Sequence, residues 1–292
     1  MMSRQAALRS LLFVPGNSER KLQRALTSSA DALILDLEDS VSAAQKSVAR
    51  ALVTAFLAEH GAQRKHRYYV RVNAIETDLF ESDLAAVMVA HLDGIMLPKS
   101  EPRHVLALST NLSRLEAAHG IPSGSVKIIC IATETPSAIF ALGSYLGTST
   151  RLAGLAWGAE DLAASLGAVR TEQGFDDVYR LARTLCLLGA AAARVDAYDT
   201  VYLDYRNAAG LREESVAARR SGFAGKLAIH PDQIATINEA FSPTTEEVAW
   251  ASRVVSAFDS NPDAGAIGIE GQMIDRPHYV LAQRILSRVR GS

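Results

Sequence analysis

Two carboxylates follow directly after short apolar runs in the middle of the chain. Glu134 follows the run that begins at Lys127, and Asp161 follows the run that begins at Leu152. If these runs are neighbouring parallel strands, about 5 Å apart, one cation can bridge both carboxylates. Two carboxylates without clustered histidines or thiols favour a hard ion, Mg²⁺ or Mn²⁺. The alternative is that both acids simply begin helices, where the helix dipole favours negative charge.

A second group of charges surrounds Arg71. Arg71 lies in the run 68–73, and Asp36 and Glu38 lie at the end of the run that begins at Ala32. A buried arginine needs an anionic partner, because an unpaired buried charge is strongly destabilising. We therefore expect Arg71 to contact an anionic substrate group, with Glu38 orienting Arg71 or metal-bound water. A structural ion pair of Arg71 with Asp36 or Glu38 is the alternative.

The elements that position these side chains follow an alternating pattern. Continuously apolar runs, typical of strands buried on both faces of a parallel sheet, alternate with amphipathic segments such as 18–29, 43–59 and 176–194. The runs cover residues 10–14, 32–37, 68–73, 94–98, 127–132, 152–157, 198–203 and 226–229. Eight such repeats predict an α/β fold, a TIM (β/α)₈ barrel with its site at the C-terminal ends of the strands. An open doubly wound sheet is the alternative.

The pattern changes after Pro231. A helix capped by Thr245 is expected through Phe258, then a hairpin turning at residues 270–271, then a helix from Pro277. We therefore predict a barrel domain over residues 1–240 and a C-terminal helix-hairpin-helix lid extension over residues 241–292.

Composition excludes several classes of protein. The 292 residues include 30 Lys and Arg against 32 Asp and Glu, a net charge of −2, so neither nucleic acid nor a membrane is an expected partner. Cys130 and Cys186 are the two cysteines, which excludes a disulfide framework. The chain begins without the apolar stretch of a signal peptide, and we expect a cytoplasmic protein.

An ordered set of short motifs resembles a known family. The motifs cover residues 9–16, 31–41, 71–73, 97–99, 134–136, 158–162, 225–231 and 271–275. They resemble the citrate lyase β-subunit-like, or CitE-like, family of the HpcH/HpaI aldolase/citrate lyase superfamily.

The resemblance implies a TIM barrel that assembles as a trimer or a hexamer, with Mg²⁺ on Glu134 and Asp161 and with Arg71 on the substrate. It implies a carbon–carbon lyase that cleaves a 3-hydroxyacyl-CoA thioester, of the citramalyl-CoA or malyl-CoA type, to acetyl-CoA and a 2-oxo acid. Coenzyme A is then part of the substrate. The alternatives are a citrate lyase β subunit acting on citryl-acyl carrier protein, a malyl-CoA thioesterase, and a non-catalytic homologue that binds CoA esters.

The resemblance also assigns roles to further residues. Asp275 matches the family's catalytic acid/base, which reaches the site from the lid of a neighbouring subunit, and burial under a closed lid would raise its pKa. Without the resemblance, Asp275 reads as the N-cap of the last helix. Pro15 and Asn73 are expected to bind the substrate, and Arg20 and Lys21 to contact the phosphates of coenzyme A.

Overall fold

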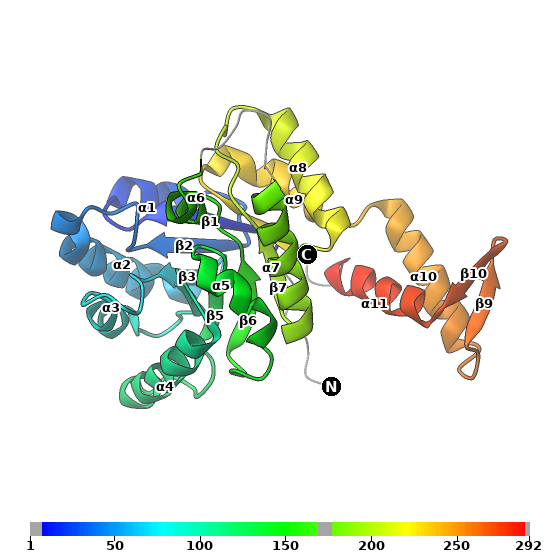
Figure 1. Cartoon of the computed structure of the whole chain (residues 1–292), viewed down its shortest axis with the longest axis horizontal. Helices are drawn as coiled ribbons and strands as arrows, with labels where there is room; N and C mark the ends of the chain where they lie inside the picture. The colour runs from blue at the N-terminus through cyan, green and yellow to red at the C-terminus, as the bar shows by residue number, and fades with distance from the viewer. Residues whose placement is uncertain (1–7, 169–176, 290–292) are drawn as a thin grey trace. The chain divides into compact units, whose positions relative to one another are not determined.

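The computed structural model describes residues 8–168 and 177–289, and within them eight parallel strands close into a barrel. Each strand pairs with the next along the chain, and the eighth pairs with the first. Figure 1 labels β1, β2, β3, β5, β6 and β7 of this barrel. The strands are β1 (Ser10–Pro15), β2 (Ala32–Asp36), β3 (Arg67–Arg71), β4 (Gly94–Leu97), β5 (Lys127–Ile131), β6 (Leu152–Ala156), β7 (Asp196–Asp199) and β8 (Gly225–Ala228). The predicted TIM barrel is confirmed, and closure excludes the open doubly wound sheet.

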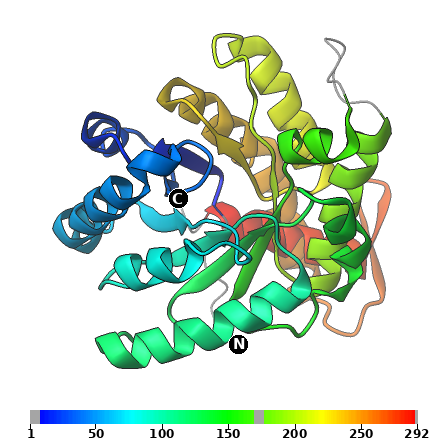
Figure 2. The same cartoon turned by 60° about the vertical axis from the view of Figure 1, so that its left-hand side comes forward.

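Helices alternate with the strands and form the outer layer of the barrel (Figure 2). They are α1 (Glu19–Ala25), α2 (Lys46–His60), α3 (Phe80–Val87), α4 (Pro102–His119), α5 (Pro136–Ala141), α6 (Glu160–Leu166), α7 (Asp177–Ala193), α8 (Ala208–Ser221) and α9 (Ile234–Phe241). Strands β2 and β4 are buried at every residue, because the barrel interior covers one face and the helices cover the other. The helix predicted over 176–194 is α7, and residue 176 itself lies outside the described residues.

The seventh strand corrects the sequence-based prediction. The run 198–203 was expected to form it, but β7 ends at Asp199. An acidic residue can end this buried strand because its carboxylate is fully paired. Lys226 Nζ lies 3.0 Å from Asp199 Oδ2, and Trp157 Nε1 donates to Asp199 Oδ1 at 2.7 Å. These contacts offset the cost of burying the charge, and the sequence pattern alone gives no sign of them.

Residues 8–240 form one compact unit, and the described residues after 240 belong to a second. The second unit contains α10 (Thr245–Asp259), the antiparallel hairpin β9 (Ala266–Ile269) and β10 (Gln272–Asp275), and α11 (Arg276–Val289). The predicted helices and hairpin are confirmed. Its small core includes Val254, Phe258 and Ile274.

Two details of the second unit bear on the prediction. The N-cap of α10 is Thr244 rather than Thr245, because the Thr244 hydroxyl accepts the N–H of Glu247 in a capping box. The hairpin turns at Glu270 and Gly271, whose φ values of 50° and 78° are those of a tight two-residue turn. No helix of the described residues is both long and apolar enough to cross a bilayer.

Candidate active site

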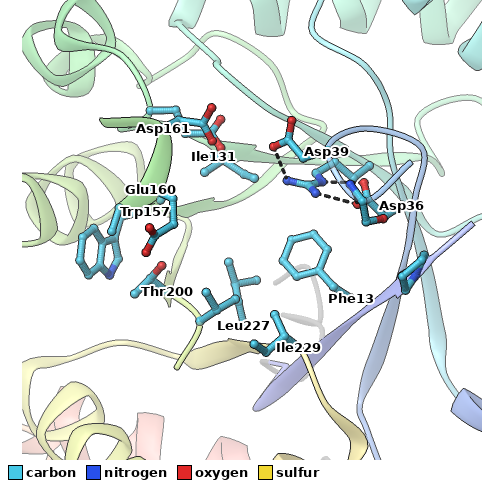
Figure 3. A pocket seen from close by; sticks show the side chains of 17 residues that line it. Phe13, Asp36, Asp39, Ile131, Trp157, Glu160, Asp161, Thr200, Leu227 and Ile229 are labelled. Atoms are coloured by element: carbon cyan, nitrogen blue, oxygen red, sulfur yellow. Dashed lines mark hydrogen bonds and ion pairs between the residues drawn. The ribbon is translucent and has the colours of Figure 1, made fainter. Parts of the chain in front are cut away.

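A cavity of about 320 Å³ lies where the barrel strands end. Its polar side includes Arg71, Glu134 and Asp161, as the sequence predicts, and Pro15 also lines it. Its apolar side is formed by Phe13, Ile131, Trp157, Val201, Leu227 and Ile229. Figure 3 shows Phe13, Leu227 and Ile229 together on this apolar side, with Asp161 and Asp39 across from them. The cavity therefore offers charged groups on one wall and apolar side chains on the other.

Arg71, at the end of β3, is held rigidly. Its Nε and Nη2 donate to the two carboxylate oxygens of Asp36, both at 2.7 Å, and its Nη1 lies 2.9 Å from Glu38 Oε2. The ring of Phe13 packs 4.7 Å from the guanidinium carbon. Burial opposes the charge of Arg71, but these carboxylates outweigh it and raise its pKa. The structural ion pair thus exists, yet a guanidinium has more N–H donors than these contacts use, so a ligand can still be bound.

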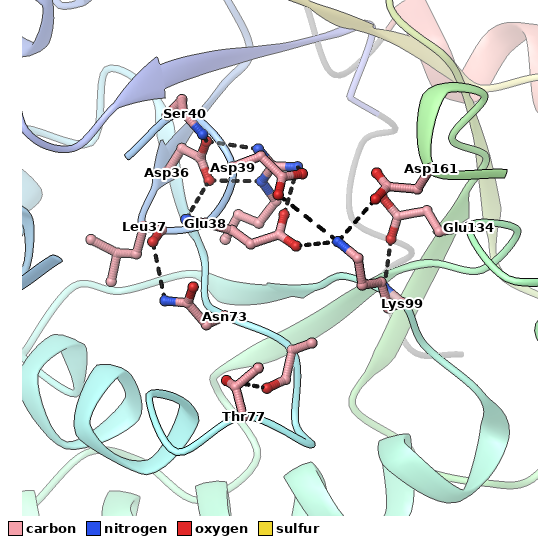
Figure 4. A network of polar contacts seen from close by, with 12 residues as sticks. Asp36, Leu37, Glu38, Asp39, Ser40, Asn73, Thr77, Lys99, Glu134 and Asp161 are labelled. Carbon is pink, nitrogen blue, oxygen red and sulfur yellow. Dashed lines mark hydrogen bonds and ion pairs between the residues drawn. The ribbon is translucent and has the colours of Figure 1, made fainter. Parts of the chain in front are cut away.

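Glu134 and Asp161 follow two neighbouring strands, β5 and β6, and both line the cavity (Figure 4). Glu134 follows β5 and is only 3% exposed, whereas Asp161 lies in the first turn of α6 with its side chain 33% exposed. The helix-start alternative therefore holds for Asp161. It does not hold for Glu134, because the N-cap of α5 is Thr135.

Glu134 is a buried carboxylate with other carboxylates close to it. Burial, and then the charges of Glu38 and Asp161, raise the pKa of Glu134 to about 8. The carboxylates in this network outnumber Arg71 and Lys99; they are Asp36, Glu38, Asp39, Glu134 and Asp161. A divalent cation would correct this imbalance, so the donor set fits Mg²⁺ or Mn²⁺. Nowhere in residues 8–168 or 177–289 do three His, Cys, Asp or Glu side chains form a metal-binding group.

Sequence reasoning gave no role to Lys99, which is central to the network (Figure 4). Its Nζ lies 2.5 Å from Glu38 Oε1 and 3.2 Å from Asp161 Oδ1, and its backbone N–H donates to Glu134 Oε2 at 2.5 Å. Its φ of 48° is left-handed, which costs a residue other than glycine about 1 kcal/mol. The available signal was its place after the fourth strand, but a lysine at a strand end is usually solvated.

Two predicted residues have contacts that position other groups. Glu38 bridges Arg71 and Lys99, as its predicted orienting role requires. Asn73 is buried and does not line the cavity; its amide nitrogen donates to Leu37 O at 3.1 Å and its amide oxygen accepts from Lys46 Nζ at 2.8 Å. These contacts fix the loop after β2, and substrate binding by Asn73 stays a prediction.

The remaining predicted residues are Arg20, Lys21 and Asp275. Arg20 and Lys21 are exposed on α1, and their contact with coenzyme A stays a prediction. Asp275 ends β10 in the second unit, where its Oδ1 lies 2.5 Å from Nδ1 of His278. The hydrogen bond with His278 lowers the pKa of Asp275, whereas burial under a lid was expected to raise it.

Replacing Glu134 by glutamine is expected to stabilise the metal-free protein by about 1–4 kcal/mol near pH 8. The pKa of Glu134 is 4.5 when unperturbed and about 8 in the fold. Between these values the folded state holds a proton that the unfolded state has lost, so the free energy of unfolding falls as pH rises. Glutamine has no charge to bury and can still accept the N–H of Lys99.

Urea unfolding of EDTA-treated protein, from about pH 5 to about pH 8, measures this effect. The stability of the wild type should decline across this range relative to Glu134→Gln. Glu160→Gln is the matched control, because Glu160 is an exposed acid on the same cavity. Equal slopes for wild type and Glu134→Gln would show that Glu134 is not a strained carboxylate.

The chain is similar to several known proteins. The profile of the HpcH/HpaI aldolase/citrate lyase family matches residues 9–231. Citrate lyase subunit beta of Escherichia coli (strain K12) is 36% identical over 283 residues, which cover 96% of this chain and 92% of that protein. The mitochondrial citramalyl-CoA lyase of Rattus norvegicus is 32% identical over 296 residues, covering 96% of this chain and 85% of that one.

A solved structure covers nearly the whole chain. The crystal structure of the protein CitE from Mycobacterium tuberculosis, in complex with magnesium, acetoacetate and coenzyme A, matches with a TM-score of 0.76 and 33% sequence identity. The match covers 98% of this chain and 99% of that one.

Proposed function

Since the chain belongs to the HpcH/HpaI aldolase/citrate lyase family, we propose that it is a Mg²⁺-dependent carbon–carbon lyase acting on a 3-hydroxyacyl-CoA thioester. The products would be acetyl-CoA and a 2-oxo acid, from a substrate of the citramalyl-CoA or malyl-CoA type. The observation that carries this proposal is the convergence of Arg71, Glu134 and Asp161 on one cavity. The magnesium and coenzyme A of the CitE complex support the choice of metal and of thioester.

Glu134 and Asp161 would hold the metal, and Mn²⁺ could replace Mg²⁺ there. When bound, the metal would supply Lewis-acid polarisation of the 3-hydroxyl oxygen, which favours release of the hydroxyl proton to solvent as that oxygen becomes the ketone of the 2-oxo acid. Arg71, fixed by Asp36 and Glu38, offers its remaining donors to the thioester oxygen, where negative charge develops as the carbon–carbon bond breaks. The apolar side of the cavity would surround that charge with fewer competing water molecules than bulk solvent does.

The released carbon needs a proton, and we assign that transfer to Asp275. In the cleavage direction, its protonated form gives the proton to the methylene carbon of the acetyl-CoA enolate. In the condensation direction, its carboxylate takes a proton from the methyl group of acetyl-CoA. The lowered pKa of Asp275 keeps it ionised at neutral pH, which suits the condensation direction.

A citrate lyase β subunit is the second candidate. It is favoured by the 36% identity to the Escherichia coli protein of that name, and it would need a thioester on an acyl carrier protein. The same cavity could also hydrolyse malyl-CoA, or bind a CoA ester without reaction. We prefer cleavage because the chain has residues for each part of that reaction: Glu134 and Asp161 to hold the metal, Arg71 to stabilise the enolate oxygen and Asp275 to transfer the proton.

We also propose that the chain forms a homo-oligomer, a trimer or a hexamer. The family resemblance implies that Asp275 of one copy would reach the site of another, which supports an oligomer. Exposed apolar side chains of the second unit, Met273, Val280 and Leu281, support a contact surface there. Light scattering coupled to size-exclusion chromatography checks the assembly, and a monomer would contradict it.

The proposed reaction is tested with purified citramalyl-CoA, malyl-CoA and citryl thioesters. The 2-oxo acid and the free thiol are measured separately, with Mg²⁺ and after EDTA treatment. A lyase releases 2-oxo acid without free thiol, and a thioesterase releases thiol without 2-oxo acid. Full activity in EDTA would contradict the metal role, and cleavage of only the carrier-protein thioester would identify the citrate lyase reaction.

A further inference from the structure

One lysine contacts both predicted metal ligands through two different groups. The Lys99 backbone N–H donates to Oε2 of Glu134, and its ammonium lies 3.2 Å from Oδ1 of Asp161. The same ammonium lies 2.5 Å from Glu38 Oε1 and 3.9 Å from Asp39 Oδ1. A unit positive charge therefore stands beside the carboxylate that is expected to take a divalent cation.

The two cations of the network differ in their freedom to move. Arg71 is locked by two parallel hydrogen bonds to Asp36 and by the ring of Phe13, and its side chain is 12% exposed. The Lys99 side chain is 30% exposed and ends in a single nitrogen on a flexible stem. Lys99 can thus leave Asp161 and keep its shorter contact with Glu38, whereas Arg71 cannot move without breaking a bidentate pair.

The backbone of Lys99 is fixed even though its side chain is flexible. The left-handed φ of 48° and the bond from its N–H to buried Glu134 hold the residue at the mouth of the barrel. Movement of the ammonium therefore leaves the hydrogen bond that orients Glu134 in place. Lys99 therefore contacts the two predicted ligands independently: its backbone N–H orients Glu134, and its ammonium pairs with Asp161.

We propose that the Lys99 ammonium is an internal counterion that pairs with Asp161 when no metal is bound and competes with the metal for that carboxylate. The proposal rests on the metal site of the proposed function. Lys99 then weakens metal binding, while it prevents repulsion among Glu38, Asp39 and Asp161 in the metal-free protein. It is a positioning residue, because it acts through Asp161.

The test measures metal affinity rather than catalysis. Full-length EDTA-treated protein is titrated with Mn²⁺ and with Mg²⁺ by calorimetry, for wild type, Lys99→Met and Lys99→Gly. Both variants should bind metal more tightly, by about tenfold, because the competing charge is gone. Without metal they should melt at a lower temperature than wild type, and added Mn²⁺ should raise the melting temperature more than it does in wild type. Lys99→Gly guards against misfolding, since a φ of 48° suits glycine.

Two further variants separate this role from a general loss of charge. Lys99→Arg keeps a cation at the site and should keep the weak affinity. Lys46→Met removes a nearby lysine whose ammonium donates to Leu37 O, Glu38 O and Asn73 Oδ1. This variant should change the metal affinity by less than about threefold.

Unchanged or weaker metal binding in both Lys99→Met and Lys99→Gly would overturn the proposal. The outcome is independent of the thioester assay. A wild type that binds Mn²⁺ but cleaves no thioester would contradict the proposed function and leave the counterion role standing. If the wild type cleaves thioesters but the Lys99 variants have the same metal affinity as the wild type, only the counterion role is contradicted.

Discussion

Replacing Arg71 by lysine is expected to lower kcat/KM for thioester cleavage by about 10²–10³-fold. An ammonium cannot copy the two parallel bonds, each 2.7 Å long, that fix the guanidinium on Asp36. It would also lack the additional donors that the proposed mechanism directs at the developing enolate oxygen. Steady-state kinetics with Mg²⁺ and citramalyl-CoA or malyl-CoA, whichever the enzyme cleaves, measure the effect.

A matched replacement lies at the other end of the same strand. Arg67 begins β3 and pairs with Asp93 at 2.8 Å, away from the cavity, so Arg67→Lys should leave kcat/KM nearly unchanged. Metal affinity should be preserved in Arg71→Lys, since Glu134 and Asp161 are intact. Near-normal kinetics of Arg71→Lys would assign Arg71 to structure alone, which is the role that its ion pairs with Asp36 and Glu38 also permit.

Replacing Asp275 by asparagine is expected to lower turnover by about 10²–10⁴-fold, the range for loss of a general acid or base. Exchange of the acetyl-CoA methyl protons with deuterium from the solvent should fall to background. The amide cannot carry the proton, but it is similar in shape to the carboxylate and can still contact His278. Proton NMR of acetyl-CoA in deuterated buffer with the 2-oxo acid present measures the exchange directly.

Metal binding distinguishes a chemical role of Asp275 from a structural one. Asp275→Asn should bind Mn²⁺ as the wild type does, because Asp275 is not one of the proposed ligands. Glu270→Gln is the control, since Glu270 is an acid at the turn of the same hairpin and pairs only loosely with Arg253, at 3.5 Å. If exchange continues unchanged in Asp275→Asn, the acid/base belongs to another residue, and Asp275 is a cap of α11.

Periodicity predicted the strands well and their ends less well. Apolar runs located the strands, although the seventh overlaps β7 at only two residues, because a parallel strand covered on both faces is largely apolar. The prediction was wrong for β7, where the run 198–203 extends past the true end at Asp199. The partners that allow Asp199 to be buried are Lys226 in β8, Trp157 just after β6 and Arg183 in α7, so no local pattern contains them.

The candidate site shows the same division between local and long-range information. Residue type and position after a strand were sufficient to select Arg71, Glu134 and Asp161, because the strands of a closed barrel all end at one mouth. Lys99 was missed, since its importance comes from contacts with Glu38 and Asp161, 61 and 62 positions away along the chain.

By itself, the sequence determined the barrel, the position of two carboxylates at its mouth, and the helix-hairpin-helix that follows. These depend on periodicity and on the order of residues, which each segment carries within itself. Only the tertiary structure decided which charges are paired, which are buried and which pKa values move. Those properties depend on distances between groups from different strands and on how far each is removed from water. The raised pKa of Glu134 and the place of Lys99 are therefore results of the fold.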